Sequence, residues 1–229
     1  MASASVWLKK DPRVMNLFPD GAQADSTNNT GAKTTVQKPT QNFTTAQVFR
    51  MSQFWLLGLS WLFLSQSLHM IYIHVVPYAV DSGIAPLDAA FILSVLGVAN
   101  ILGRLVLGRL SDTMGRKALG VTCGLLHSAS LLWLMQSNQL WMMYAFAVIF
   151  GLLWGGYGAI ITSLVGDIFG TSNLGPIMGL ITAGWALGAA VGPAVGGYIF
   201  DACGSYHIAF GAGAAALLIS ACFIACIKP

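Results

Sequence analysis

Six apolar runs constrain this chain more than any other feature of its sequence. Each run approaches the roughly 20 residues that a bilayer crossing requires, and turn-forming residues separate the runs. Backbone polar groups in lipid must be paired within the protein, and helices satisfy this requirement. The runs therefore predict an all-α integral membrane protein with six transmembrane helices. We expect these helices over residues 52–76, 87–108, 118–136, 139–163, 175–199 and 206–227.

Composition agrees with a membrane protein and argues against several other functions. Of the 229 residues, 56% are hydrophobic and 8% are charged, whereas a soluble domain carries about 25% charged residues. The sequence offers no Ser/His/Asp or Cys/His set, no phosphate-binding loop and no nucleic-acid patch. Its four cysteines lack metal-ligand spacing. We therefore expect a lipid bilayer as a partner, and no enzyme activity, metal, cofactor or nucleic acid.

The first 50 residues differ in composition from the rest of the chain. They are rich in Asn, Thr, Gln, Ala and Gly, and such segments bury too little apolar surface to become ordered. We predict a largely disordered segment over residues 1–50, with a short amphipathic helix at 43–50. Residues 51–229 are predicted to form the six-helix transmembrane domain.

Positive charges predict the orientation in the membrane. With six crossings, the Lys and Arg residues before the first run, after the second and after the sixth all fall on one side. The links on the other side, 77–86, 137–138 and 200–205, contain none. Because the basic side is the cytoplasmic one, we expect a multi-pass protein of the cell membrane with both termini in the cytoplasm.

A compact charged motif, G-R-L-S-D-T-M-G-R-K, follows the second run. We expect Gly108 to let its helix approach a neighbour, and Asp112 to accept N–H bonds at the start of a facing helix. Asp167, at the end of the fourth run, is the expected partner of Arg116. Such a cluster can latch helix ends and open during a change of state, or it can be a basic anchor without a moving role. The expected gate consists of Gly108, Asp112, Gly115, Arg116, Lys117 and Asp167.

The motif, in this position, resembles the signature loop of the major facilitator superfamily, whose members have two six-helix halves. In the fifth run, residues 188–197 read G-A-A-V-G-P-A-V-G-G, which is similar to a motif of the family's antiporters. Helix packing is an equally good interpretation of that stretch, because small residues allow helices to approach closely. The glycine stripe that predicts such packing comprises Gly175, Gly179, Gly184, Gly188, Gly192 and Gly196.

Other stretches narrow the resemblance to oxalate/formate-antiporter-like and monocarboxylate-transporter-like members. Residues 9–12 and 17–21 are similar to the central loop that follows the sixth helix of those proteins. Residues 53–57, 74–84, 167–170 and 197–201 resemble parts of their seventh, tenth and eleventh helices. The resemblance therefore implies that the chain corresponds to a C-terminal half, and that an N-terminal six-helix half is its partner.

Arg104 is the one positive charge within an apolar run, and an intramembrane charge is by default a functional-site hypothesis. Its guanidinium fork matches a carboxylate. The alternative is snorkelling, because Arg104 lies about 6 Å before the expected helix end at Gly108. In the monocarboxylate group an arginine of the eighth helix pairs with the substrate carboxylate, and Arg104 matches that position. Asn100, on the same face, replaces the Asp of proton-coupled relatives and cannot carry a proton.

The first run adds Gln66, His69 and Tyr72 near one helix face. His69 can relay protons or bind substrate, and a histidine that serves helix packing is an equal alternative. Trp154, Tyr157 and Trp185 are further candidates for lining a cavity, with core packing as the commoner explanation for all three.

These observations predict half of a secondary active transporter that works by alternating access, with its site near the midplane. The predicted substrates are small organic anions, in particular monocarboxylates such as formate, lactate or pyruvate. One alternative is an exporter or sugar-type carrier of the same superfamily in which Arg104 is structural. Another is a truncated membrane fragment that does not transport. The predicted substrate-binding residues are Arg104, Asn100, His69, Tyr72 and Gln66.

Overall fold

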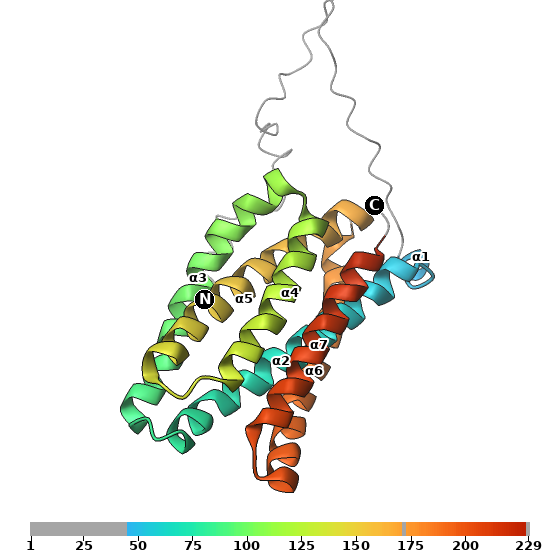
Figure 1. The fold of residues 1–229 in the computed structure, drawn as a ribbon. Helices are drawn as coiled ribbons and strands as arrows, with labels where there is room; N and C mark the ends of the chain where they lie inside the picture. Colours follow the sequence, from blue (N-terminus) through green and yellow to red (C-terminus); the bar gives the residue numbers. More distant parts are fainter. Residues whose placement is uncertain (1–44, 171–172, 228–229) are drawn as a thin grey trace, which may run out of the picture. The chain divides into compact units, whose positions relative to one another are not determined.

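The structure, a computed structural model, describes residues 45–170 and 173–227. The described residues hold six helices that are long and apolar enough to cross a membrane, as the sequence predicts. A four-residue helix, α1 (Thr45–Val48), precedes them, within the segment predicted at 43–50. The prediction of disorder falls mainly on residues 1–44, which lie outside the described residues. The spanning helices are α2 (Ser52–Asp81), α3 (Pro86–Met114), α4 (Arg116–Met135), α5 (Leu140–Phe169), α6 (Leu174–Cys203) and α7 (Tyr206–Cys226) (Figure 1).

The predicted link at residues 108–117 is mostly helical, so this part of the prediction is wrong. α3 continues through the charged motif to Met114, and α4 begins at Arg116. One residue, Gly115, separates them, with φ of +89°, a conformation that a residue with a Cβ rarely adopts. The end of an apolar run indicates where the chain leaves the hydrocarbon. The helix itself ends only where the backbone leaves the helical conformation, which here is at Gly115.

Glycines bring α3 and α5 into close contact along their middle. A Cβ built on Gly155 would overlap the carbonyl oxygen of Asn100, and one built on Gly103 would overlap the backbone of α5. One turn earlier, a Cβ on Gly151 would lie 2.5 Å from the carbonyl oxygen of Leu96. The contacts advance in the same direction on both helices, so α3 and α5 run parallel.

The glycine stripe of α6 forms a similar parallel contact with α2. A Cβ on Gly188 would lie 2.9 Å from the backbone nitrogen of Gln66, and one on Gly192 would overlap the Gln66 carbonyl. Gly184 and Gly196 also meet α2, whereas Gly175 and Gly179 have open space around them. The packing prediction is therefore confirmed for four of the six glycines. The helices α4 and α7 pair differently, since they run antiparallel.

The helix contacts repeat within the chain. The first three spanning helices, α2 to α4, correspond in order to the last three, α5 to α7. The contact of α3 with α5 then corresponds to that of α6 with α2, and the contact of α4 with α5 to that of α7 with α2. In Figure 1, α3, α4 and α5 accordingly lie side by side, and α2, α6 and α7 form the neighbouring group. Repeats of three helices with inverted topology are a feature of transporter folds that bind near the membrane midplane.

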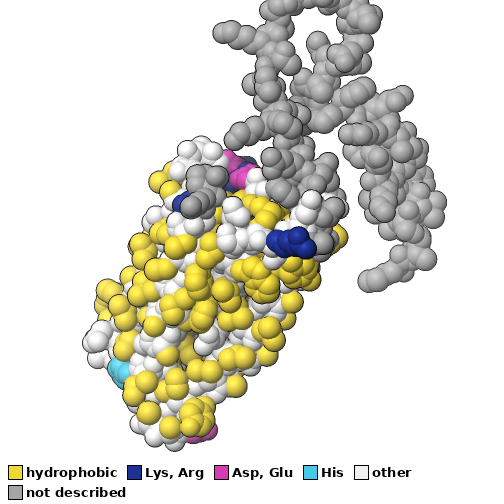
Figure 2. Space-filling view, turned by 90° about the vertical axis from the view of Figure 1, so that its right-hand side faces the viewer, with side chains coloured by type: hydrophobic (Ala, Val, Ile, Leu, Met, Phe, Trp, Pro, Cys, Tyr) yellow, Lys and Arg dark blue, Asp and Glu magenta, His cyan; other side chains and the backbone are white. Residues whose placement is uncertain are grey.

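α3 and α6 are the least buried of the six helices. Fewer than a quarter of the residues in their most apolar windows are buried, against half or more in the other four helices. On α3 the exposed residues include Val98 and Leu102, which line an apolar groove of about 340 Å³ between α3 and α5. Figure 2 shows a broad hydrophobic surface with charged side chains toward its ends. These apolar faces are suited to lipid or to another membrane segment.

Candidate functional site

Arg104 lies deeper in its helix than the sequence indicates. Ten residues of α3 follow it, up to Met114, or about 15 Å of helix. The estimate of about 6 Å is therefore wrong, because α3 does not end at Gly108. The Arg104 side chain is exposed, and among residues 45–170 and 173–227 no carboxylate pairs with its guanidinium. A cation within a spanning helix that has no counter-ion among the described residues is suited to bind an anion.

Two consecutive residues of α5 connect Arg104 with α2. Tyr72 packs edge-to-face on Trp154, with ring centroids 6.2 Å apart, and remains 43% exposed. The next residue, Gly155, packs against the Asn100 carbonyl, and a Cβ on it would lie 2.8 Å from the Arg104 nitrogen. Tyr72, Asn100 and Arg104 are thus held at one level of the helices. The Asn100 Nδ2 is buried and has no hydrogen-bond partner in the part of the chain that the structure describes.

His69 lies one turn before Tyr72 on α2 and faces α6. Its Nδ1 lies 2.9 Å from the Ser65 carbonyl oxygen and 3.2 Å from the Ser65 Oγ. The ring packs edge-to-face on Trp185 at 5.4 Å, and Trp185 in turn contacts Trp61 at 5.7 Å. The Trp61 Nε1 is buried and unpaired among the described residues. Aromatic rings and a half-buried imidazole therefore make up the α2/α6 side of the candidate site.

Of two other candidates, the structure separates only Tyr157 from this cluster. Gln66 meets α6 through its backbone, at the glycine contact described above. Tyr157 is fully buried, with its hydroxyl 3.0 Å from the Ser220 Oγ and 3.3 Å from the Ser60 Oγ. It joins α5 to α2 and α7, so the suggestion that it lines a cavity is wrong. Trp154 and Trp185 are half-buried and stay candidates.

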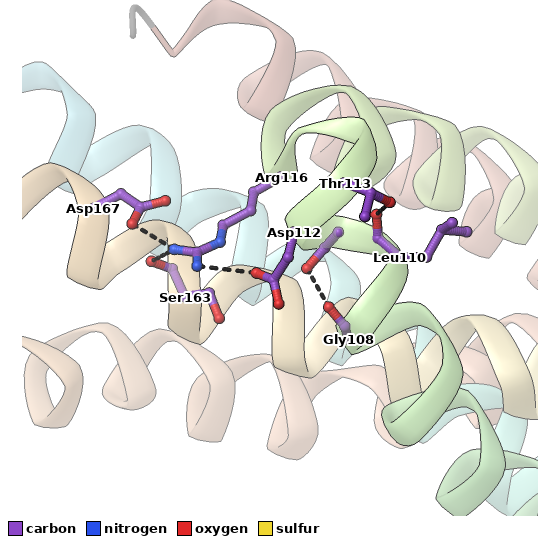
Figure 3. Close-up of polar contacts among 8 residues, drawn as sticks. Gly108, Leu110, Asp112, Thr113, Arg116, Ser163 and Asp167 are labelled. Atoms are coloured by element: carbon purple, nitrogen blue, oxygen red, sulfur yellow. Dashed lines mark hydrogen bonds and ion pairs between the residues drawn. The ribbon is translucent and has the colours of Figure 1, made fainter. Parts of the chain in front are cut away.

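The charged motif forms a cluster at the end of α3 and the start of α4. Figure 3 shows the Arg116 guanidinium between two carboxylates, with Asp112 at 3.1 Å and Asp167 of α5 in close contact. Arg116 also donates to the Ser163 carbonyl at 3.1 Å. One arginine thus links α3, α4 and α5, and the expected pairing of Arg116 with Asp167 is present.

Three other expectations for the motif are wrong. Asp112 binds Arg116 one turn along the chain, and not the start of a facing helix, because α3 carries it past the hydrocarbon. Lys117 turns away from the carboxylates and donates to the Ile227 carbonyl at 2.5 Å, where it caps α7. Gly108 is not required for a close approach, since a Cβ built on it would come no nearer to a neighbour than 3.8 Å, at the Ala159 Cβ. We name Asp112, Arg116 and Asp167 the basic-end cluster.

Sequence reasoning missed the residue that orients His69. Ser65 precedes His69 by four positions, a spacing at which side chains share a helix face, so this local signal was available. The contacts of Tyr72 with Trp154, and of Gly155 with Asn100, carry no such signal because they join helices far apart in the chain.

Four of the six spanning helices pack in two parallel pairs and two in an antiparallel pair, and α3 carries an arginine that has no ion-pair partner among the described residues. This arrangement defines a polytopic membrane protein. The family model of the Major Facilitator Superfamily matches residues 7–229. The chain belongs to this superfamily.

Curated relatives agree with this assignment. Monocarboxylate transporter 12 of Xenopus laevis is 31% identical over 162 residues, which cover 69% of this chain and 35% of the relative. Its human counterpart is 31% identical over 164 residues, covering 70% and 32%. The niacin transporter NiaP of Acinetobacter baylyi is 28% identical over 163 residues, covering 71% and 37%. The chain therefore spans about a third of the length of these relatives.

Proposed function

We propose that the chain is one half of a secondary active transporter for small organic monocarboxylates. The observation that carries this proposal is Arg104, an exposed cation of α3 that has no ion-pair partner among the described residues. A guanidinium in a low-dielectric surrounding attracts anions strongly, and its fork fits a carboxylate. The buried, unpaired Asn100 Nδ2 supplies a further donor beside it. The printed names of the relatives, monocarboxylate and niacin transporters, agree with a carboxylate substrate.

The second half of the transporter is proposed to cover the exposed apolar faces of α3 and α6. Support comes from their low burial and from the share of the relatives that the chain spans. A substrate site between two six-helix halves would then be walled by both halves, and rocking of one half against the other would open it to one side of the membrane at a time. The basic charges at the α3/α4 turn support an orientation with this end and both termini in the cytoplasm.

Reconstitution into liposomes tests this proposal. We expect uptake of labelled lactate, pyruvate or niacin when the chain is combined with a matching N-terminal six-helix half, and little or no uptake by either half alone. The N-terminal half by itself and empty liposomes are the controls. Uptake of a sugar in place of every carboxylate would favour the sugar-type carrier. No uptake of any solute by the combined halves would favour a non-transporting fragment.

The basic-end cluster is proposed to act as a latch that opens during transport. Asp112 and Asp167 are 62% and 54% exposed, and ion pairs of this exposure stabilise a protein by less than about 1 kcal/mol. We therefore expect Asp167→Asn to change the unfolding temperature little but to change the uptake rate severalfold. Asp201→Asn, at the opposite end of the helices, is the matched control. Unchanged uptake in Asp167→Asn would leave the cluster as a basic anchor.

A further inference from the structure

The hydrogen bonds of Ser65 determine which nitrogen of His69 carries the proton. The Ser65 hydroxyl donates to the Trp185 carbonyl at 2.7 Å, so its hydrogen is already engaged. The Ser65 carbonyl, 2.9 Å from the His69 Nδ1, can only accept. Nδ1 must therefore hold the hydrogen in the neutral ring. The lone pair is on Nε2, for which no hydrogen bond is present among the described residues.

Two other histidines of the membrane segments also donate one N–H to a backbone carbonyl. In His74, Nε2 lies 3.0 Å from the Pro193 oxygen, and in His127, Nε2 lies 3.2 Å from the Phe150 oxygen. His127 is fully buried, and its Nδ1 is sealed in the core without a partner in the described part of the chain. His69 is half-buried and lies one turn from Tyr72 on α2.

No described carboxylate faces His69. On its own helix the nearest titratable groups are Tyr72 and His74. α6, which packs against the ring, carries Tyr198, Asp201 and Cys203, and all three lie near the far end of that helix. The charged groups of α5 and α4 lie in the basic-end cluster and at Lys117. α3 contributes Arg104 at the level of Tyr72, and its carboxylates Asp88 and Asp112 lie near its two ends. α7, which also packs against α2, contains no carboxylate. Among the described residues, the His69 imidazole therefore has no ion-pair partner.

We propose that Nε2 of His69 is the proton-carrying atom of the carboxylate site, held in position by Ser65. When the site opens to one side, the Nε2 lone pair forms an N–H bond with one proton and Arg104 binds the carboxylate. Both ligands leave on the other side, where the same N–H bond breaks. The loaded site has the same net charge as the empty one, which lowers the cost of moving it through lipid. The proposal rests on the proposed function, and Asn100, beside Arg104, cannot hold the proton.

A spectroscopic test needs no transport. The full chain, labelled with ¹⁵N-histidine, is placed in lipid nanodiscs, and the difference from His69→Asn assigns the His69 signals. We expect the neutral His69 ring to carry its hydrogen on Nδ1, in contrast to His127, whose hydrogen bond to the Phe150 oxygen places it on Nε2. A neutral His69 ring protonated at Nε2 would overturn the proposal.

Uptake by the combined halves gives the second test. His69→Asn keeps an N–H for the Ser65 carbonyl but has no titratable nitrogen. His74→Gln, the matched control, keeps an N–H for the Pro193 carbonyl. With one coupled proton, uptake in the wild type and in His74→Gln should rise by up to about tenfold for each unit by which the external pH falls, and the profile of His69→Asn should be flat.

Arg104→Gln distinguishes a failure of the proposed carboxylate site from a failure of the inference about His69. If uptake survives in Arg104→Gln at every pH, the proposed carboxylate site fails. If uptake depends on Arg104 but keeps its pH dependence in His69→Asn, the inference about His69 fails while the proposed function stands. A wild type without pH dependence also overturns the inference.

Discussion

Arg104→Gln is expected to weaken the apparent affinity for carboxylates strongly without unfolding the protein. Glutamine keeps part of the length and polarity of arginine but loses the charge and the fork of donors. Hydrogen bonds to charged groups contribute about 1.5 to 3 kcal/mol, which corresponds to a loss of roughly 10- to 100-fold in apparent affinity. Initial rates of uptake of labelled lactate by the combined halves, over a range of concentrations, measure this loss.

Two further variants make the test specific. Arg109→Gln removes an exposed arginine from the same helix, five residues nearer the α3/α4 turn, and should leave uptake nearly unchanged. Arg104→Lys keeps the charge but not the planar fork, so we expect an intermediate affinity.

The opposite result has a clear meaning. If Arg104→Gln transports carboxylates as well as the wild type does, Arg104 is a structural residue that interacts with the lipid headgroups. An exporter or a sugar-type carrier would then be the better assignment within the superfamily.

Gly155→Ala is expected to destabilise the protein more than any other single-methyl change on α5. The added Cβ would overlap the Asn100 carbonyl and lie 2.8 Å from the Arg104 nitrogen. Both atoms belong to the backbone of α3, so neither can rotate away, and the two helices must separate. Overpacking of this kind costs about 1 to 3 kcal/mol. Thermal unfolding in detergent, followed by tryptophan fluorescence, measures the change.

Gly158→Ala is the matched control on the same helix. A Cβ at Gly158 meets nothing within 4 Å, and alanine favours a helix over glycine by up to about 1 kcal/mol. We expect this variant to be as stable as the wild type or slightly more stable. Equal loss of stability in both variants would contradict the close α3/α5 contact.

Much of the fold could be predicted from the sequence, because a spanning helix is a local pattern. The apolar runs located all six helices, and short links between them required neighbouring helices to alternate in direction. The ends of α3 and α5 were predicted too early, at residues 108 and 163 in place of Met114 and Phe169. Polar residues such as Asp112 continue a helix beyond the hydrocarbon, and hydropathy does not report that continuation.

The candidate site was less accessible to sequence reasoning. An intramembrane arginine is conspicuous, so Arg104 could be singled out, but its distance from the helix end depended on the true end of α3. Helices in lipid are apolar on every face, and the pattern therefore could not show that Tyr157 is buried while Tyr72 is exposed. Which helices are neighbours, and hence that Trp154 supports Tyr72, is a property of the packed structure.

The single residue between α3 and α4 has a mechanical consequence. With only Gly115 as a joint, there is no slack, and α3 cannot slide along its axis without pulling the first turn of α4. That turn begins with Arg116, which is tied to α5 through Asp167. A displacement of α3 at the level of Arg104 is thus transmitted to α4 and α5. At the other end of α3, four residues, 82–85, connect the end of α2 to the start of α3, and this longer link constrains the two helices less.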